Sequence, residues 1–554
     1  MTTRLARPGT RRPRRRALEL STGLLAAALG AFTACRTPEE YRADADQAAY
    51  TILTQRREAL GFVDRPFSLD PKPGSLRERV LDGELAGVGP LSLTQCLDVA
   101  AENSRDFQDQ RETLFLSALD LTLERWAFET QYGAGLAGLL TGTGSADNAS
   151  LSASGGLTRA LGTGAKLVSD LGLTLAHDLV AGDGWNLTSD LSFALTQPLL
   201  RGAGESIVME PLTQAERNVV YAVREYERFR RRFAIDVAGR FYRLLQQADT
   251  VANEESNYAN LQLLRERNEA LAQAGRLSDI QVDQALQDEL RSRNRLIDAR
   301  QSLQSSRDDF KVFLGLPISL DIALDGGELV RLSESEPGDV AYEESLVLAL
   351  ALEQRLDYRI AVDRRDDAER KLAVAADALR AGLGLATSAN VRSEAGQPLD
   401  FDLENVQWEV GLDLDLPIDR IAERNAYRES LISREQRRRD VDELGDTIQA
   451  DLRQELGDTR TNLEAWRIQK NAVALAERRV ESTRLNLDAG RAATRDLLEA
   501  QEALLEAQNA ATQALIDFQL AKLALWRDLE IVRVEDQGIE IEPALEQRLV
   551  RSEP

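Results

Sequence analysis

Histidine and cysteine are almost absent from this chain of 554 residues, which contains one histidine, His177, and two cysteines, Cys35 and Cys96. Any histidine-based triad or metal cluster would have to be built around that single imidazole. Two cysteines cannot form a disulfide framework or a four-cysteine zinc site. The net charge of −24 disfavours non-specific binding to nucleic acid. The sequence also lacks a Walker-type phosphate loop, so no nucleotide or other cofactor is expected.

Aromatic residues and proline are scarce as well. Aromatic side chains make up 5% of the sequence, which is thin for large globular cores. Seven of the fifteen prolines lie in the first 90 residues, whereas residues 212–316 and 418–542 contain none. Because proline interrupts helices, these two long stretches favour very long elements over the several compact domains that the length alone suggests.

The first 35 residues have the pattern of an export signal. Residues 4–16 carry seven arginines and no acid, and a short apolar stretch at 24–32 follows. This order predicts a signal peptide over residues 1–34. The break at Phe32-Thr33-Ala34-Cys35 resembles a bacterial lipoprotein signal, in which Cys35 becomes the lipidated first residue. The alternative is an ordinary signal peptide with an incidental cysteine.

No other segment is apolar and long enough to predict a transmembrane helix. A mature membrane protein would therefore have to be a β-barrel or be lipid-anchored. The second cysteine, Cys96, lies on an apolar helical pattern and is expected to be inert.

The chain contains one pattern twice. Residues 96–107 parallel residues 347–358, and Ala274-Gly275-Arg276 parallels Ala489-Gly490-Arg491. The offset falls from 251 to 215 between these matches, so the first copy carries extra residues in the region 130–200. We therefore divide the mature chain into an N-terminal extension, a first repeat, a linker, a second repeat and a tail, at residues 35–90, 91–317, 318–343, 344–530 and 531–554.

Each repeat is expected to hold a helix, a strand-like stretch and a long helical hairpin. In the second repeat apolar and polar residues alternate from Val406 to Leu416, and Pro417 ends the run. A period of two indicates a strand with one wet face. It suits either a soluble sandwich edge or a membrane barrel with a water-filled lumen. The expected partner strand is 383–391.

The first repeat shows the same alternation at 171–175 and 191–195, where Pro198 takes the place of Pro417. Small and glycine-rich residues at 133–165 indicate one or two extra strands or a long loop.

The hairpins carry a coiled-coil pattern. Seam positions of the last long helix are spaced alternately by four and three residues, at Ala500, Leu504, Ala507, Ala511, Ala514, Phe518, Ala521 and Leu525. This strict repeat favours left-handed supercoiling, and its alanines let neighbouring helices approach closely. The first repeat has a similar seam from Ala285 to Phe310, interrupted by Glu289. A lone hairpin of this length cannot bury both flanks, so packing against further helices is expected.

The hairpins are expected to turn at Gly275 and Gly490, since glycine adopts the left-handed conformation that closes a helix. Ser278 and Thr494 are the predicted caps of the returning helices, with Gln281 at a capping-box position.

Two acidic residues, Asp496 and Glu499, stand three positions apart in the first turn and a half of the last helix. They therefore occupy adjacent positions of one helix face. Taken alone, acids at this place are explained by their favourable interaction with the helix dipole.

The doubled order of helix, strands and hairpin resembles the TolC-like outer membrane efflux proteins over residues 91–530. Members of that family carry a tip glycine, an aspartate six residues on and an alanine ten residues on. Gly490, Asp496 and Ala500 match this pattern. In the first copy Gly275 and Ala285 match, but Gln281 replaces the acid. The segment 197–202 also resembles the family's strand-to-helix exit, marked by Pro198 here and by Pro417 in the second repeat.

The resemblance implies a mixed α and β membrane protein and a homotrimer. Four strands per protomer would form a transmembrane β-barrel of twelve strands in the bacterial outer membrane, and long coiled-coil helices would continue it as an α-helical barrel across the periplasm. Asp496 and Glu499 would line the periplasmic entrance. The tips at Gly275, Arg276, Leu277, Gly490 and Arg491 would dock a periplasmic adaptor protein that couples the channel to an inner-membrane pump.

The function expected from the resemblance is that of an outer-membrane exit channel of a tripartite efflux or type I secretion system. The alternative is a periplasmic coiled-coil lipoprotein that spaces the envelope without forming a pore. An enzyme is a distant third possibility, because no pattern typical of a pocket accompanies any pair of carboxylates.

Overall fold

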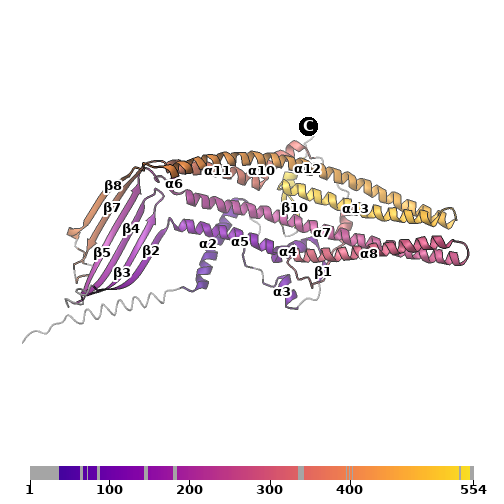
Figure 1. Cartoon of the computed structure of the whole chain (residues 1–554), viewed down its shortest axis with the longest axis horizontal. Helices are drawn as coiled ribbons and strands as arrows, with labels where there is room; N and C mark the ends of the chain where they lie inside the picture. Colours follow the sequence, from indigo (N-terminus) through magenta and orange to yellow (C-terminus); the bar gives the residue numbers. More distant parts are fainter. Residues whose placement is uncertain are drawn as a thin grey trace, which may run out of the picture.

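The computed structural model describes residues 36–62, 67–70, 73–83, 88–142, 147–178, 184–334, 342–394, 396–398, 400–401, 403–535 and 538–549. Residues 1–34 and Cys35, for which a signal peptide and a lipidation site are predicted, lie outside the described residues. The molecule is elongated, with a sheet at one end and two helical hairpins reaching to the other (Figure 1).

The strands are β1 (Val88–Leu91), β2 (Thr130–Gly142), β3 (Asp147–Ala160), β4 (Lys166–Asp178), β5 (Asn186–Pro198), β6 (Ile322–Leu324), β7 (Gly382–Arg392), β8 (Gln407–Asp415), β9 (Val532–Glu535) and β10 (Gly538–Ile541). The helices are α2 (Pro38–Ala59), α3 (Leu76–Leu81), α4 (Leu93–Asn103), α5 (Arg105–Trp126), α6 (Glu205–Val208), α7 (Glu210–Gln273), α8 (Asp279–Phe313), α9 (Gly327–Glu334), α10 (Glu344–Gln354), α11 (Leu356–Asp377), α12 (Ile421–Asp488), α13 (Thr494–Asp528) and α14 (Pro543–Gln547).

The main sheet has six strands in the order β2-β3-β4-β5-β7-β8, and every neighbouring pair is antiparallel. The predicted strands at 171–175, 191–195, 383–391 and 406–416 correspond to β4, β5, β7 and β8. The glycine-rich region 133–165 forms the two extra strands, β2 and β3. The expectation of four strands per protomer is therefore wrong, because β2 and β3 continue the same hydrogen-bonded ladder.

One face of this sheet is apolar across all six strands. Since side chains alternate along a strand, the register places on one face Tyr132, Leu136, Leu140, Leu151, Leu171, Leu175, Phe193, Leu385, Trp408, Val410, Leu412 and Leu414. The opposite face carries Lys166, Asp170, Asp190, Arg392, Glu409, Asp413 and Asp415. Trp408, Leu412 and Leu140 are more than 70% exposed in the single chain, so the apolar face has no cover from the described residues.

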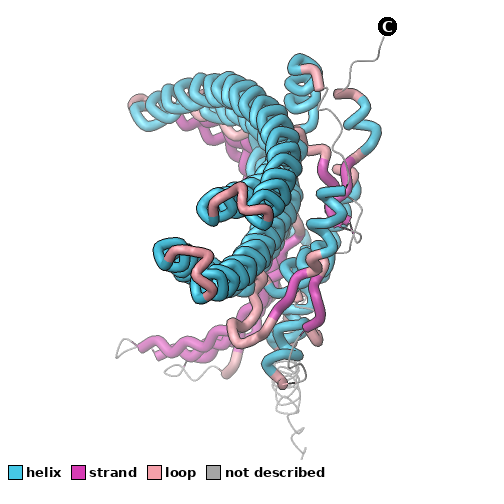
Figure 2. The backbone as a smooth tube through the Cα atoms, turned by 90° about the vertical axis from the view of Figure 1, so that its right-hand side faces the viewer, coloured by secondary structure: helices cyan, strands magenta, loops and turns pink. Residues whose placement is uncertain are grey.

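The long helices pack along their predicted seams. Ala500, Phe518 and Leu525 of α13 and Ala285 and Phe310 of α8 are all almost fully buried. The main apolar core lies midway along the molecule, where α4, α10 and β9 pack against α7, α8, α12 and α13. Viewed along the long axis, the helices follow an arc that is open on one side (Figure 2).

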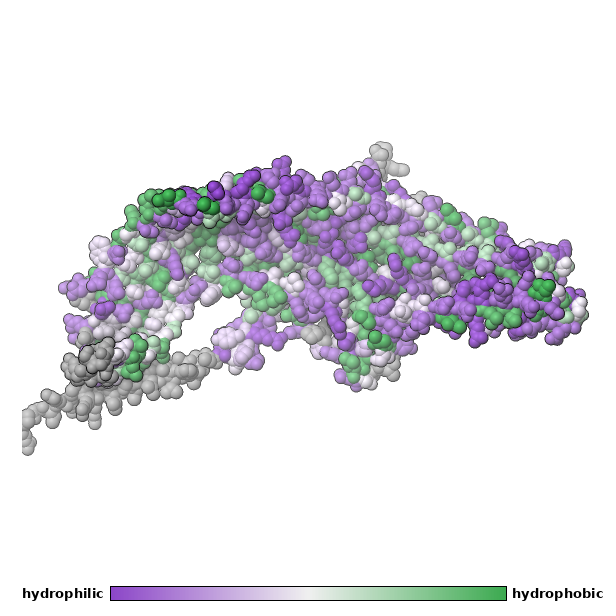
Figure 3. All heavy atoms as spheres, in the orientation of Figure 1, coloured by the Kyte–Doolittle hydropathy of each residue, from purple (hydrophilic) through white to green (hydrophobic). Residues whose placement is uncertain are grey.

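The surface agrees with this division of the molecule. On the face drawn in Figure 3, hydrophilic side chains cover most of the helical part. Hydrophobic side chains gather where β8 leads into α12 (Figure 3), and Leu416, Ile418 and Ile421 are exposed there. Within the described residues, no helix combines the length and the apolar character needed to cross a membrane.

Candidate functional site at the hairpin tips

Both hairpins turn at the predicted glycines, and in the same way. Gly275 has a φ of 71° and Gly490 a φ of 69°. The next residue in each turn, Arg276 or Arg491, donates its N–H to the carbonyl of the residue five positions earlier, at 2.9 and 2.8 Å. The glycine N–H also donates to the carbonyl three positions earlier, that of Ala272 at 2.8 Å and that of Leu487 at 3.0 Å. These two hydrogen bonds per turn satisfy the last carbonyls of α7 and α12. Arg276 and Arg491 are exposed and Leu277 is half-buried, so the tips present basic side chains to their surroundings.

The returning helices are capped differently from the prediction. The helix α8 starts after Ser278 as expected, but the Ser278 side chain makes no capping hydrogen bond. The residue before α13 is Ala493, and Thr494 is the first helical residue, so the assignment of Thr494 as the cap is wrong. The Ala493 N–H instead donates to Oδ2 of Asp496 at 2.8 Å. The Asp496 carboxylate thus supplies the half of a capping box that reaches back to the residue before the helix, and the alanine at the cap position supplies no side-chain acceptor.

Asp496 therefore has a local structural role, and its side chain is exposed. Glu499, one turn further on, forms an ion pair with Arg495 of the same helix, with Nε and Oε1 2.9 Å apart. Arg495 is the side chain that the sequence analysis missed. The spacing of four residues between Arg495 and Glu499 is the signal that predicts such a pair.

A hollow of about 250 Å³ lies between the two hairpins just behind the tips. Its charged lining consists of three acidic and three basic side chains, Asp288, Glu499, Glu502, Arg291, Arg295 and Arg495. Arg291 contacts Asp288 at 2.9 Å, and Arg295 lies 3.7 Å from Glu502. The wall is thus mixed in charge, and Glu499 belongs to a set of ion pairs rather than to an isolated acidic patch.

Direct contacts between the hairpins hold them side by side. Arg267 of α7 forms an ion pair with Asp488 of α12 at 2.7 Å, and Arg295 of α8 approaches Glu502 of α13. Further from the tips, Thr512 donates a hydrogen bond to Asp249 at 2.7 Å. A small apolar cluster, made of Leu261, Leu264, Leu497 and Leu498, fills the space between these polar contacts.

The other end of the helices is joined to the sheet at the predicted prolines. Pro198 is the last residue of β5, and Pro417 follows the end of β8. Arg201 forms an ion pair with Asp415 at 2.7 Å, which ties the exit of β5 to the end of β8. Arg420 donates to the carbonyl oxygen of Pro417 at 3.1 Å. Each exit is therefore fastened by an arginine placed three residues after its proline.

A cluster of eight charged side chains lies where four helices meet in the middle of the molecule. Arg228 contacts Asp357 and Glu530 at 2.7 and 3.3 Å. Arg527 contacts Asp528 and Glu455 at 2.6 and 3.4 Å. Arg231 pairs with Glu530, and Arg355 with Asp357. The sequence analysis did not find this cluster, because its members come from segments far apart in the chain.

Glu455 and Asp528 have opposite pKa shifts in this cluster. Burial raises the pKa of Glu455 to about 8, and its hydrogen bond and repulsion with Asp528 act in the same direction. Burial also opposes ionisation of Asp528, but hydrogen bonds from Arg527 and Glu455 outweigh it and lower the pKa of Asp528. At neutral pH the Glu455 carboxyl is therefore mainly protonated and donates to the Asp528 carboxylate.

This arrangement predicts a pH dependence of stability. Between the usual pKa of a glutamate and about 8, the folded protein holds a proton on Glu455 that the unfolded chain releases. Stability is therefore expected to fall as pH rises through this range. In Glu455→Gln the fall between pH 5 and 8.5 should be clearly smaller, as measured by thermal unfolding. Glu464→Gln, at an exposed position of the same helix, should retain it. Parallel curves for the two variants would refute the assignment.

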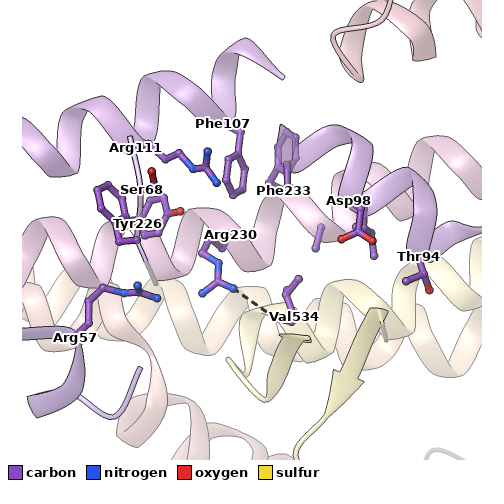
Figure 4. A pocket seen from close by; sticks show the side chains of 14 residues that line it. Arg57, Ser68, Thr94, Asp98, Phe107, Arg111, Tyr226, Arg230, Phe233 and Val534 are labelled. Atoms are coloured by element: carbon purple, nitrogen blue, oxygen red, sulfur yellow. Dashed lines mark hydrogen bonds between the residues drawn. The ribbon is translucent and has the colours of Figure 1, made fainter. Parts of the chain in front are cut away.

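The N-terminal helix α2 is fastened to the body by a buried ion pair. Arg57 contacts Glu227 of α7 at 3.3 Å, and both side chains are more than 90% buried. Arg57 borders a cavity of about 100 Å³ that Arg111 and Arg230 also line (Figure 4). Arg230 contacts Glu227 at 2.8 Å and the carbonyl oxygen of Val534 at 3.5 Å. The cavity thus joins α2, α7 and the C-terminal strand β9.

The described cysteine and histidine, Cys96 and His177, lie in packing contacts rather than in a reactive site. Cys96 is fully buried in α4, and burial raises the pKa of its thiol to about 12, as expected for an inert cysteine. His177, next to the last residue of β4, stacks on Trp185 with ring centroids 5.0 Å apart. Among the described residues, no group of three or more histidine, cysteine, aspartate or glutamate side chains is placed to hold a metal ion.

Comparison with solved structures identifies the fold. The chain is similar to the transmembrane channel CusC, with a TM-score of 0.58 and 13% identity over 84% of this chain and 95% of that one. It is similar to the Campylobacter jejuni outer membrane channel CmeC, with a TM-score of 0.57 and 13% identity over 79% of this chain and 85% of that one. It is also similar to the Vibrio cholerae outer membrane protein VceC, with a TM-score of 0.57 and 15% identity over 79% of this chain and 95% of that one.

No protein-family model and no curated protein matches the sequence. The likeness in three dimensions nevertheless covers most of the chain and nearly the full length of these channels. It confirms the resemblance found in the sequence: the chain has the fold of TolC-like outer membrane efflux channels.

Proposed function

We propose that the protein is an exit channel in the outer membrane that serves a tripartite efflux or type I secretion system. Three copies form it, and their sheets line a barrel in the membrane. Their long helices continue the barrel as a tunnel through the periplasm. Cys35 anchors each copy to the membrane through its lipid, after removal of residues 1–34. The duct performs no reaction and needs no cofactor.

The observation that carries this proposal is the join between an apolar-faced sheet and very long helices in one chain. The sheet offers lipid an apolar face that carries Arg159 at the end near the helices, and it turns most of its charged side chains the other way. The helix α12 has 68 residues and is therefore about 100 Å long. A sheet suited to lipid at one end and hairpins of this length at the other fit a duct that starts in a membrane.

The lengths of the elements support an internal repeat. Helices α8 and α13 have 35 residues each, and α5 and α11 have 22 each. The helices α7 and α12, with 64 and 68 residues, precede matching glycine turns. Two such units per copy and three copies give a ring of similar hairpins, to which the arc in Figure 2 contributes one third.

Reconstitution into a planar lipid bilayer tests the channel against the alternative of a scaffold without a pore. The full chain is expected to insert and to give discrete conductance steps. A lipoprotein that only spaces the envelope would bind the membrane through its lipid and give no steps. Gel filtration in detergent, with the mass of the detergent subtracted, should give three copies per particle.

We propose that Asp496 and Glu499 line the periplasmic entrance. Three copies place six carboxylates around one axis, where they repel one another when the tunnel narrows and attract cations. The Arg495–Glu499 ion pair holds one of these carboxylates in each copy. The entrance therefore combines an exposed Asp496 with a Glu499 that is partly neutralised.

Removing the acids at the tips and removing Arg495 should change the block of the channel by cations in opposite directions. Asp496→Ala with Glu499→Ala should weaken the block of single-channel current by a multivalent cation about tenfold, since 1.4 kcal/mol of lost attraction corresponds to that factor. Arg495→Ala releases Glu499 and should strengthen the block. Unchanged conductance and unchanged block in both variants would disprove the entrance assignment while leaving the channel itself in place.

The tips themselves are proposed to dock a periplasmic adaptor protein, which links the duct to an inner-membrane pump. The docking segments are Gly275, Arg276 and Leu277 on the first hairpin and Gly490 and Arg491 on the second. Two features support this: the tips are the exposed ends of the molecule farthest from the sheet (Figure 1), and both present an arginine directly after the turn.

A further inference from the structure

The six-stranded sheet has two open edges, β2 and β8. Each pairs with one neighbouring strand, β2 with β3 and β8 with β7, and the described residues supply no second partner for either. The strands alternate in direction along the sheet, so β2 and β8 run in opposite directions. The β2 strand begins and the β8 strand ends on the side of the helices (Figure 1). The two edges can therefore pair with each other as antiparallel strands.

The added strands β2 and β3 belong to the wall of the sheet rather than to a lid over it. Thirteen successive residues of β2 pair with β3 without a shift in register, and the same holds between β3 and β4. Leu136 stands opposite Ala153, which stands opposite Leu173. The apolar face thus runs through the added hairpin, and the exposed Tyr132 and Leu140 extend it towards the β2 edge.

Six strands cannot close on themselves in a membrane, because the smallest barrels of the bacterial outer membrane have eight strands. An open edge within lipid leaves backbone groups without hydrogen bonds, at a cost of several kcal/mol per group. A second copy offers the missing partner for each edge, in the right direction and at the same end of the molecule. The number of copies, three, is taken from the proposed function, and this inference rests on that proposal.

We propose that β8 of one copy pairs with β2 of the next, and that three copies close a barrel of eighteen strands. With strands about 4.8 Å apart and tilted by about 40°, eighteen strands give a diameter of about 36 Å between backbones, against about 24 Å for twelve. The outlet is therefore wider than the resemblance to twelve-stranded channels implies.

The inner surface of the added hairpin suits a wide outlet. The side chains of β2 and β3 on this face are uncharged and mostly small, including Gly133, Gly135 and Ala137 on one strand and Ser152 and Ser154 on the other. The acids Asp170, Asp190, Glu409, Asp413 and Asp415 stand on the remaining four strands. One third of the wall thus adds width without adding charge or bulk, which suits large cargo.

Cross-linking of single cysteines tests the pairing of the edges. In a Cys96→Ser background, Ala137→Cys on β2 and Gly411→Cys on β8 face the same side of the sheet near mid-strand. A short bis-maleimide should join neighbouring copies of this variant into dimers and trimers in the membrane. The control combines Gly411→Cys with Thr174→Cys on the inner strand β4, and Gly411→Cys alone measures the background through Cys35. Linkage through position 174 instead of 137 would overturn the proposal, because it would place β4 at the edge.

Excision of the added hairpin gives an independent measurement. Residues 130–160 begin and end on the side of the helices, so their removal joins α5 to the turn before β4 without crossing the sheet. Averaged particle images should show a barrel narrowed by about one third relative to the full chain. Equal widths would overturn the proposal of eighteen strands. A full chain that forms no trimers and gives no conductance would instead refute the proposed function.

Discussion

Phe193→Arg is expected to prevent stable assembly of the protein in a membrane. Phe193 lies at the middle of β5 with its side chain 47% exposed, on the apolar face opposite Ser169 and Ala389. If this face contacts lipid, an arginine at mid-membrane depth costs about 2–4 kcal/mol per copy. Three copies multiply that cost, so the fraction of protein that resists urea extraction from vesicles should fall severalfold.

The neighbouring residue provides a matched control. Ser192 precedes Phe193 on the same strand and lies on the opposite face, opposite Asp170 and Asn390. The same substitution there, Ser192→Arg, points the charge into the lumen beside an acid and should leave assembly intact while changing ion selectivity. Equal extraction of the two variants would mean that neither face contacts lipid, which contradicts a membrane barrel.

Gly315→Ala is expected to destabilise the middle of the molecule strongly. Gly315 ends the turn after α8 with a φ of 74°, and a Cβ at this position would overlap the carbonyl oxygen of Asn103 at the end of α4. The left-handed conformation alone costs an alanine about 1–2 kcal/mol, and forcing apart packed backbones adds a similar amount or more. We expect a total loss of about 3–5 kcal/mol, measured by urea unfolding of the detergent-solubilised protein.

Gly490→Ala separates the two causes of this loss. Gly490 has a similar φ of 69°, but a Cβ there meets no atom within 4 Å. The conformational cost remains without the overlap, so a loss of about 1–2 kcal/mol is expected. If the two variants unfold at the same urea concentration, the close approach of Gly315 to Asn103 does not exist in solution.

The offset of 215 found in the sequence pairs Gly315 with a residue that lacks the conformational freedom of glycine. Glu530, at the offset of 215 from Gly315, has a φ of 57° and is the only non-glycine residue with a positive φ in the part of the chain that the structure describes. Its carboxylate pairs with Arg228 and Arg231. The ion pairs that the Glu530 side chain forms in the buried cluster of charges thus offset the strain of its left-handed backbone.

Local features of the molecule were predictable from local patterns. Gly275 and Gly490 close the hairpins because a helix end needs a left-handed residue, and that requirement involves only five neighbouring residues. The strands β4, β5, β7 and β8 follow from alternation, and the seam of α13 follows from the spacing of its alanines. The cap of α13 was predicted wrongly, because the helix begins one residue earlier than a Thr494 cap requires. The N–H of Ala493 donates to the Asp496 carboxylate, and the Thr494 hydroxyl is buried without a hydrogen-bond partner.

The sequence by itself determined the class of fold, the hairpin turns and the two-sided character of the strands, since periodicity records which side of a segment avoids water. Only the tertiary structure decided what each side meets. It brought Arg267 to Asp488 and Arg295 to Glu502 between the hairpins. It gathered Glu455, Asp528 and six further charged groups from four helices and the residues next to their ends. It also decided that the glycine-rich segment joins the wall as β2 and β3, because a pattern of small residues permits a strand without naming its partner.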